Sequence, residues 1–206
     1  MNIKKLHYFT GITLSIFVGF HLFNHLYSLF GPNAHIELMQ KLRFVYRNVI
    51  TEAILLLAVA VQIVSGLKLF SRKRKTASSF FEKLHISSGL YMAFFLVVHV
   101  GAVLSGRFIL NLDTNFYFGA AGLNIFPLNL FFVPYYGLAI ISFFGHIAAV
   151  HFKKMKYSPL GIRPHRQSFF ILIFGILLSM IILYGLTNGF KGVEIPKEYN
   201  LFTSIM

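Results

Sequence analysis

Histidine is the residue type whose spacing in this chain most directly indicates chemistry. Residues 5–22 read KLHYFTGITLSIFVGFHL and residues 83–100 read KLHISSGLYMAFFLVVHV, so one pattern of Lys-Leu-His, a small polar residue, Gly, an apolar run and His occurs twice, 78 residues apart. The closing histidines are His21 and His99. Imidazole is the commonest metal ligand among side chains. The repeat therefore makes these two residues the first candidates for holding a shared ligand.

The composition places these histidines in a membrane. Hydrophobic residues make up 56% of the 206 residues and charged residues only 12%, whereas soluble domains have about 25% charged residues. The mean hydropathy is +0.70. Cysteine is absent, so this chain alone cannot build a disulfide framework, a thiolate metal site or an iron–sulfur cluster.

Five apolar runs are long enough to cross a bilayer as helices, which takes about 20 residues each. They are residues 8–30, 50–71, 84–106, 126–152 and 168–189, separated by short polar connections. We therefore expect an all-α integral membrane protein whose residues 1–206 form a single five-helix bundle. The repeat makes the first and second helices correspond to the third and fourth.

Lysine and arginine are distributed unevenly between the two ends of this bundle. Twelve lie on the side of the N-terminus and six on the other side. Because cytoplasmic loops collect Lys and Arg, we expect the N-terminus inside and the C-terminus outside, in a multi-pass protein of a bacterial cytoplasmic membrane. The net charge of +13 is explained by this asymmetry without nucleic-acid binding, and the basic side could also attract anionic lipid or an acidic partner.

With this topology the first and third helices cross in the same direction, so His21 and His99 lie at the same depth, about 21 Å along each helix from the first histidine of the repeat. Gly11 and Gly89 also share a register, and glycine allows a flat ligand to come close. Polar residues inside a membrane are costly and usually functional. Two facing imidazoles in an apolar slot are typical of haem ligation, with His21 and His99 bound to the iron. The simpler alternative is a pair of histidines that only form interhelical hydrogen bonds.

Other histidines compete for these roles. His25 follows His21 by one turn in the segment HLFNH and is a second candidate ligand. His146 lies in the fourth helix, and Gln62 lies at a similar depth in the second.

The chain resembles the single-chain, five-helix cytochrome b membrane anchors of succinate:quinone oxidoreductases and fumarate reductases. The likeness rests on helix order, histidine placement and the segments VQIVSGLKLF, SFFGHIAAVHF and PHRQSFFILIFGILL besides the two repeats. It implies an electron-transfer subunit that binds haem b, exchanges electrons with a quinone and has no catalytic activity by itself. Flavoprotein and iron–sulfur subunits would dock on the cytoplasmic side.

The resemblance implies an outer haem on His21 and His99 and an inner haem on Gln62 and His146. Gln62 departs from the pattern because a carboxamide is a poor iron ligand. Three alternatives follow: one haem only, an inner haem with His85 or His151 as substitute ligand, or a relative that no longer serves succinate oxidation.

Quinone chemistry needs hydrogen-bond donors and a proton-exchanging group near the ring. On the inner side we expect His85, Ser87, Ser88 and Arg166 to line such a pocket, and on the outer side Glu52 with His25. A function of a different class stays open, namely a haem-free or metal-binding membrane scaffold or transporter with structural histidines. Whether the chain forms a homo-oligomer is also open.

Overall fold

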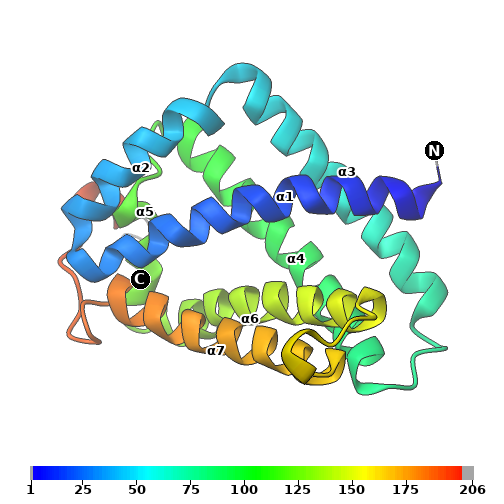
Figure 1. Ribbon diagram of the computed structural model, residues 1–206. Helices are drawn as coiled ribbons and strands as arrows, with labels where there is room; N and C mark the ends of the chain where they lie inside the picture. The colour runs from blue at the N-terminus through cyan, green and yellow to red at the C-terminus, as the bar shows by residue number, and fades with distance from the viewer. Residues whose placement is uncertain (1, 201–206) are drawn as a thin grey trace.

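The computed structural model describes residues 2–200, and within that range all regular structure is helical (Figure 1). The seven α-helices are α1 (Ile3–Leu26), α2 (Pro32–Tyr46), α3 (Val49–Lys73), α4 (Phe80–Phe108), α5 (Phe116–Asn124), α6 (Asn129–Lys154) and α7 (Pro164–Leu186). Three short 3-10 helices are η1 (Tyr27–Phe30), η2 (Pro159–Gly161) and η3 (Lys197–Tyr199).

Five of these helices, α1, α3, α4, α6 and α7, are long and apolar enough to cross a membrane, with α1 and η1 forming one such segment. They match the five runs predicted from the sequence, with boundaries shifted by a few residues: the first span begins at Ile3 and the last runs over Pro164–Leu186. Two helices were not predicted. These are α2 and α5, which follow α1 and α4 in the connections at one end of the bundle.

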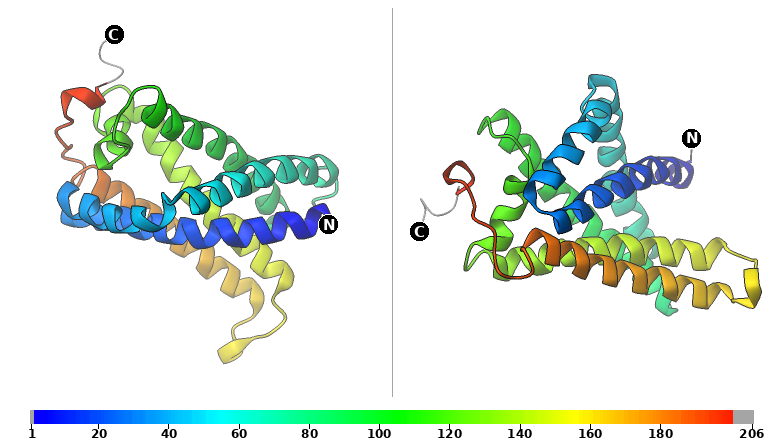
Figure 2. Two further views of the ribbon diagram at one scale, coloured as in Figure 1. Left: turned by 90° about the horizontal axis from the view of Figure 1, so that it is seen from above. Right: turned by 60° about the vertical axis from the view of Figure 1, so that its left-hand side comes forward.

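The two ends of the bundle are called the basic end and the far end. The basic end carries residue 2 and the connections 74–79 and 155–163, and the far end carries α2, α5 and the segment 187–200. Figures 1 and 2 show that the chain starts at one end and that η3 lies at the other. The spans α1, α4 and α7 therefore run from the basic end to the far end, and α3 and α6 run back.

Local signals explain where the spans begin. The Ser79 hydroxyl accepts a hydrogen bond from the Glu82 backbone N–H, and the Glu82 carboxylate accepts one from the Ser79 N–H, which forms a capping box at the start of α4. Asn2 and Asn48 cap α1 and α3 through their side-chain oxygens. These caps fix the helix starts, and with them the depth of every side chain along each span.

The spans pack as neighbouring pairs, α1 with α3, α4 with α6 and α6 with α7, while α3 also contacts α4 and α7 contacts α1. The main buried apolar cluster lies at the far end and contains Leu22, Phe116, Ala120, Leu123, Ile140, Leu178, Ile182 and Leu186. Many large apolar side chains on the outer faces of the spans remain exposed, such as Phe20, Leu57 and Val97. An apolar exterior of this extent is expected of helices surrounded by lipid.

Candidate functional site

The far half of the bundle contains a cluster of four histidines. His21 of α1 and His99 of α4 have ring centroids 6.0 Å apart, with ring planes inclined by 65°. They come from spans that run in the same direction, and both side chains are only partly exposed. The structure thus brings together the two residues that the internal repeat marked out.

His25 and His35 extend this cluster toward the far surface. Nε2 of His25 lies 3.2 Å from Nε2 of His21, and Nδ1 of His25 lies 3.3 Å from Nε2 of His35. The Asn24 amide nitrogen lies 3.1 Å from the same His35 nitrogen. Both ring nitrogens of His25 are therefore engaged by other histidines, which makes His25 a connecting residue between α1 and α2.

His35 is the most buried histidine of the group, with 2% of its surface exposed. It lies in α2, outside the spans, and its pKa is lowered to about 4, mainly by burial and to a smaller extent by His21 and Arg43. The ring is therefore neutral at neutral pH. His35 was not predicted as a site residue, although a histidine just after the Gly31-Pro32 breaker could have signalled a helix folding back over the first span.

Aromatic rings flank the central pair of histidines. Phe17 stacks on His21 at 5.7 Å and Phe95 stacks on His99 at 4.9 Å, each four residues earlier on the same helix. Tyr136 of α6 approaches His99 edge-on at 6.4 Å. Flat apolar walls of this kind orient the imidazoles and suit a planar ligand.

A second polar cluster lies in the basic half. Nδ1 of His7 lies 2.8 Å from the Ser65 hydroxyl, and the Thr10 hydroxyl donates to Oε1 of Gln62 at 2.8 Å. These two contacts join α1 to α3. Gln62 is thus engaged by a neighbour on α1, and Thr10 and Ser65 are members of the cluster that were not predicted from the sequence.

His146 belongs to this second cluster and faces α4. Its ring centroid lies 4.2 Å from that of His85, and its Nδ1 lies 3.4 Å from the Ser88 hydroxyl. The predicted pairing of Gln62 with His146 is not among the contacts of the described residues. His146 instead shares its surroundings with His85.

The two register glycines serve the basic half. A Cβ on Gly11 would lie 2.9 Å from the Gln62 amide nitrogen, and a Cβ on Gly89 would lie 3.3 Å from Cε1 of His146. Each glycine precedes its far-half histidine by ten residues, about 15 Å of helix rise. Gly11 and Gly89 therefore allow close packing against Gln62 and His146, and they do not flank the rings of His21 and His99.

A shallow groove of about 220 Å³ opens between α4 and α6 beside this cluster. Its lining includes the predicted Ser87 and Ser88 together with Tyr91 and Ser142, which were not predicted. The Tyr91 hydroxyl donates to the Tyr135 carbonyl at 2.9 Å. Ser87 and Ser142, with the buried Ser88 behind them, make this otherwise apolar groove able to hydrogen-bond a polar group.

The remaining predicted residues lie elsewhere. Glu52 pairs with Arg107 of α4, and the described residues show no contact between Glu52 and His25. Arg166 is exposed in the first turn of α7. Nε2 of His151 lies 2.8 Å from Oε1 of Gln167, which ties the end of α6 to the start of α7.

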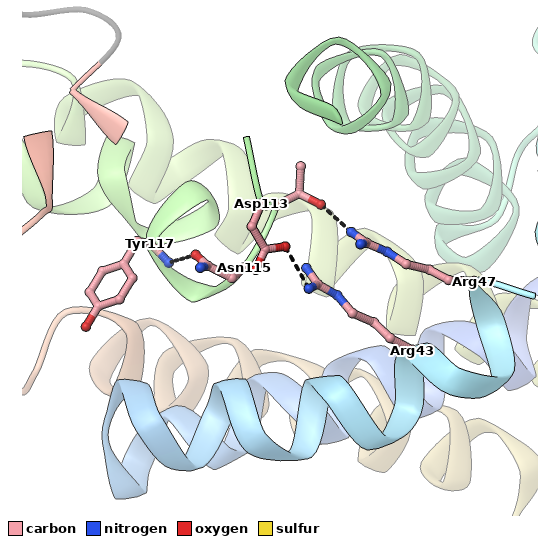
Figure 3. Close-up of polar contacts among 6 residues, drawn as sticks. Arg43, Arg47, Asp113, Asn115 and Tyr117 are labelled. Atoms are coloured by element: carbon pink, nitrogen blue, oxygen red, sulfur yellow. Dashed lines mark hydrogen bonds and ion pairs between the residues drawn. The ribbon is translucent and has the colours of Figure 1, made fainter. Parts of the chain in front are cut away.

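An arginine cluster covers the far end, made of Arg43, Arg47 and Arg107 (Figure 3 shows the first two). Arg43 donates to Asp113 and Arg47 donates to the Thr114 hydroxyl, each at 2.7 Å. Both contacts join α2 to the segment between α4 and α5. All three belong to the six basic residues expected on the side of the bundle opposite the N-terminus.

Within residues 2–200, no three His, Asp or Glu side chains are arranged to hold a metal ion by themselves. Comparison with known proteins adds no relative: no family model, no curated protein and no solved structure matches this chain.

Proposed function

We propose that this protein is a membrane electron-transfer subunit that binds one haem b through His21 and His99 and exchanges electrons with a quinone. The observation that carries the proposal is the 6.0 Å separation of the two imidazole centroids from parallel-running spans. A metal–imidazole nitrogen bond is about 2 Å long, so two imidazoles sharing one metal have ring centres about 6 Å apart. The stacked Phe17 and Phe95 rings suit a planar porphyrin, and the described residues contain no group of three His, Asp or Glu that could hold a bare metal ion.

His21 is favoured over His25 as the ligand on α1. His25 has a histidine partner on each of its ring nitrogens, whereas His21 has only its Nε2 engaged, by His25. The haem, when bound, would supply one-electron chemistry at this level of the membrane. His21 and His99 would orient it, and the phenylalanine rings would exclude water.

One haem is favoured over two. Gln62 is hydrogen-bonded to Thr10, and the His85 and His146 rings, at 4.2 Å, are closer than a shared iron requires. His151 is held by Gln167. These contacts satisfy the basic-half side chains without a second iron.

The groove between α4 and α6 is the favoured place for a quinone headgroup. Ser87 and Ser88 donate to carbonyls of their own helix in the structure and would have to turn toward a quinone oxygen. Ser142 lines the same groove, and His146 lies within 3.4 Å of Ser88 as a proton-exchanging group. The orientation and the partner subunits proposed next follow from the resemblance to succinate:quinone oxidoreductase anchors. The basic end would face the cytoplasm and dock flavoprotein and iron–sulfur subunits, and the chain alone would have no catalytic activity.

The test is a reduced-minus-oxidised visible spectrum of the purified protein with a pyridine haemochrome count per chain. We expect one low-spin haem in the wild type, lost in His21→Ala and His99→Ala. His151→Ala is the matched control, because it removes a histidine whose partner is a glutamine on the next helix, and it should retain haem, as should His25→Ala. Wild-type protein that lacks haem despite ample haem supply, or haem retained in His99→Ala, would overturn the proposal.

A further inference from the structure

The arginine cluster at the far end contains more positive charge than its acidic partners neutralise. Asp113 pairs with Arg43 and Glu52 pairs with Arg107, while Arg47 donates to the Thr114 hydroxyl and forms no ion pair within residues 2–200. The three guanidinium groups lie close enough that burial, Arg43 and Arg107 together lower the pKa of Arg47. Such a group of cations is costly to bury unless an anion joins it.

Arg43 is the member with unused donors. Its side chain is only 12% exposed, and Nη1 donates to Asp113, which is itself 47% exposed. Nε and Nη2 are buried and make no hydrogen bond of full geometry among the described residues, with the neutral Tyr46 hydroxyl as a weaker contact of the same guanidinium. A guanidinium normally uses such paired donors on a carboxylate or phosphate, so this side chain lacks an anionic partner on its buried side.

A short chain of ring contacts connects Arg43 to the histidine pair. Tyr46, one turn after Arg43 on α2, is close to its guanidinium, and burial raises the pKa of Tyr46 while Arg43 lowers it. The Tyr46 ring packs edge-on against Phe17 at 5.5 Å, and Phe17 stacks on His21. Two more buried polar atoms without partners, Oδ1 of Asn24 and Nδ1 of His35, lie at the same junction of α1 and α2.

We propose that Arg43 binds a carboxylate of the ligand held between His21 and His99. The inference rests on the proposed function, because a haem carries two propionate carboxylates on one edge and its iron between the imidazoles. Arg43 would anchor that edge under α2, with Arg47 adding positive charge. Arg43 is therefore assigned as a positioning residue for the ligand, in addition to its visible role in holding Asp113.

The first experiment compares two ligands in apoprotein-containing membranes from haem-depleted cells, namely haem and its dimethyl ester, which lacks both carboxylates. Because the ester lacks the charged groups that Arg43 would bind, the wild type should retain haem at least about tenfold better than the ester. In Arg43→Gln that preference should disappear, and in Arg43→Lys it should be intermediate. Equal retention of haem and ester by the wild type would overturn the proposal, whatever the variants do.

The second experiment separates ligand binding from simple fastening of the loop. Asp113→Asn breaks the same ion pair as Arg43→Gln but changes the charge in the opposite direction. Loss of a positive charge favours ferric haem, so Arg43→Gln should lower the haem midpoint potential; a tenfold change in relative affinity corresponds to about 59 mV for one electron. Asp113→Asn should retain haem, with its potential unchanged or raised.

The outcomes separate the two proposals. Wild-type protein without haem would contradict the proposed function. Wild-type haem with unchanged potential and ester discrimination in Arg43→Gln, or equal haem loss in Arg43→Gln and Asp113→Asn, would contradict the Arg43 assignment alone.

Discussion

Glu52 and Arg107 form an ion pair between the first turn of α3 and the last turn of α4. The acidic residue lies at a helix N-terminus and the basic residue at a helix C-terminus, so each also favours its own helix dipole. Both side chains are mostly buried, at 24% and 20% exposure, and two hydrogen bonds join them. By contrast, Glu37 and Lys41 of α2 are 70% exposed. The two pairs therefore allow the effect of burial to be measured within one protein.

Substituting Glu52 by Gln should destabilise the protein by about 1–3 kcal/mol, because Arg107 is left partly buried without its ion-pair partner. The same change at Glu37 should have a much smaller effect, since exposed helix pairs contribute little. Thermal unfolding in detergent, followed by circular dichroism, measures both. Equal effects of the two substitutions would mean that burial does not strengthen the Glu52–Arg107 pair.

Among the described elements, α6 and α7 share the most extensive helix–helix contact and are joined by the short connection 155–163. Small residues allow this approach. A Cβ on Gly175 of α7 would collide with the Phe144 side chain, whose Cβ and Cγ are the nearest atoms. Because that part of a phenylalanine cannot swing away freely, the two helices would have to move apart. His146 belongs to α6, and Ile182 of the main apolar cluster belongs to α7.

Gly175→Ala should destabilise the protein by about 1–3 kcal/mol, the usual cost of overpacking. Gly101→Ala is the matched control, because Gly101 also lies within a span but a Cβ there meets nothing within 4 Å. The control should be neutral or slightly stabilising, since alanine is the better helix former. Detergent melting temperatures of the two variants provide the measurement, and a similar loss in both would contradict the packing explanation.

The whole molecule has opposite chemical character at its two ends. The basic end carries the clusters Arg72–Lys75 and Lys153–Lys156, while the far end is covered by α2, α5 and the segment 187–200. α2 follows α1 at the far end (Figure 1), where His35 contacts His25 and Arg43 donates to Asp113 (Figure 3). The far histidine cluster is thus covered by α2. The groove of the basic half opens on the outer face of the bundle, between α4 and α6.

The orientation of these two ends can be tested directly because the chain has no cysteine. Single cysteines at Lys75 and Lys41 should react oppositely with a membrane-impermeant maleimide added to intact spheroplasts. Lys41→Cys should be labelled and Lys75→Cys protected until the cells are lysed, as the Lys/Arg asymmetry predicts. Leu57→Cys, on a lipid-facing part of α3, is the control that stays unlabelled in both conditions. Labelling of Lys75→Cys in intact cells would show that the orientation is opposite to the one predicted.

The helical class, the five spans and the common depth of His21 and His99 were predictable from the sequence alone. These follow from local properties, namely apolar run length and residues per helical turn. Which side chains are in contact became known from the tertiary structure alone. Gln62 contacts Thr10, His151 contacts Gln167, and Arg43 contacts Asp113, which is 70 residues away in the sequence. The helices α2 and α5 also became known from the tertiary structure. Their segments are too polar or too short to be predicted as membrane spans, and they are held in place by packing at the far end. Contacts between distant residues depend on which of the five apolar helices pack against one another. Hydropathy alone does not distinguish among the possible packing arrangements.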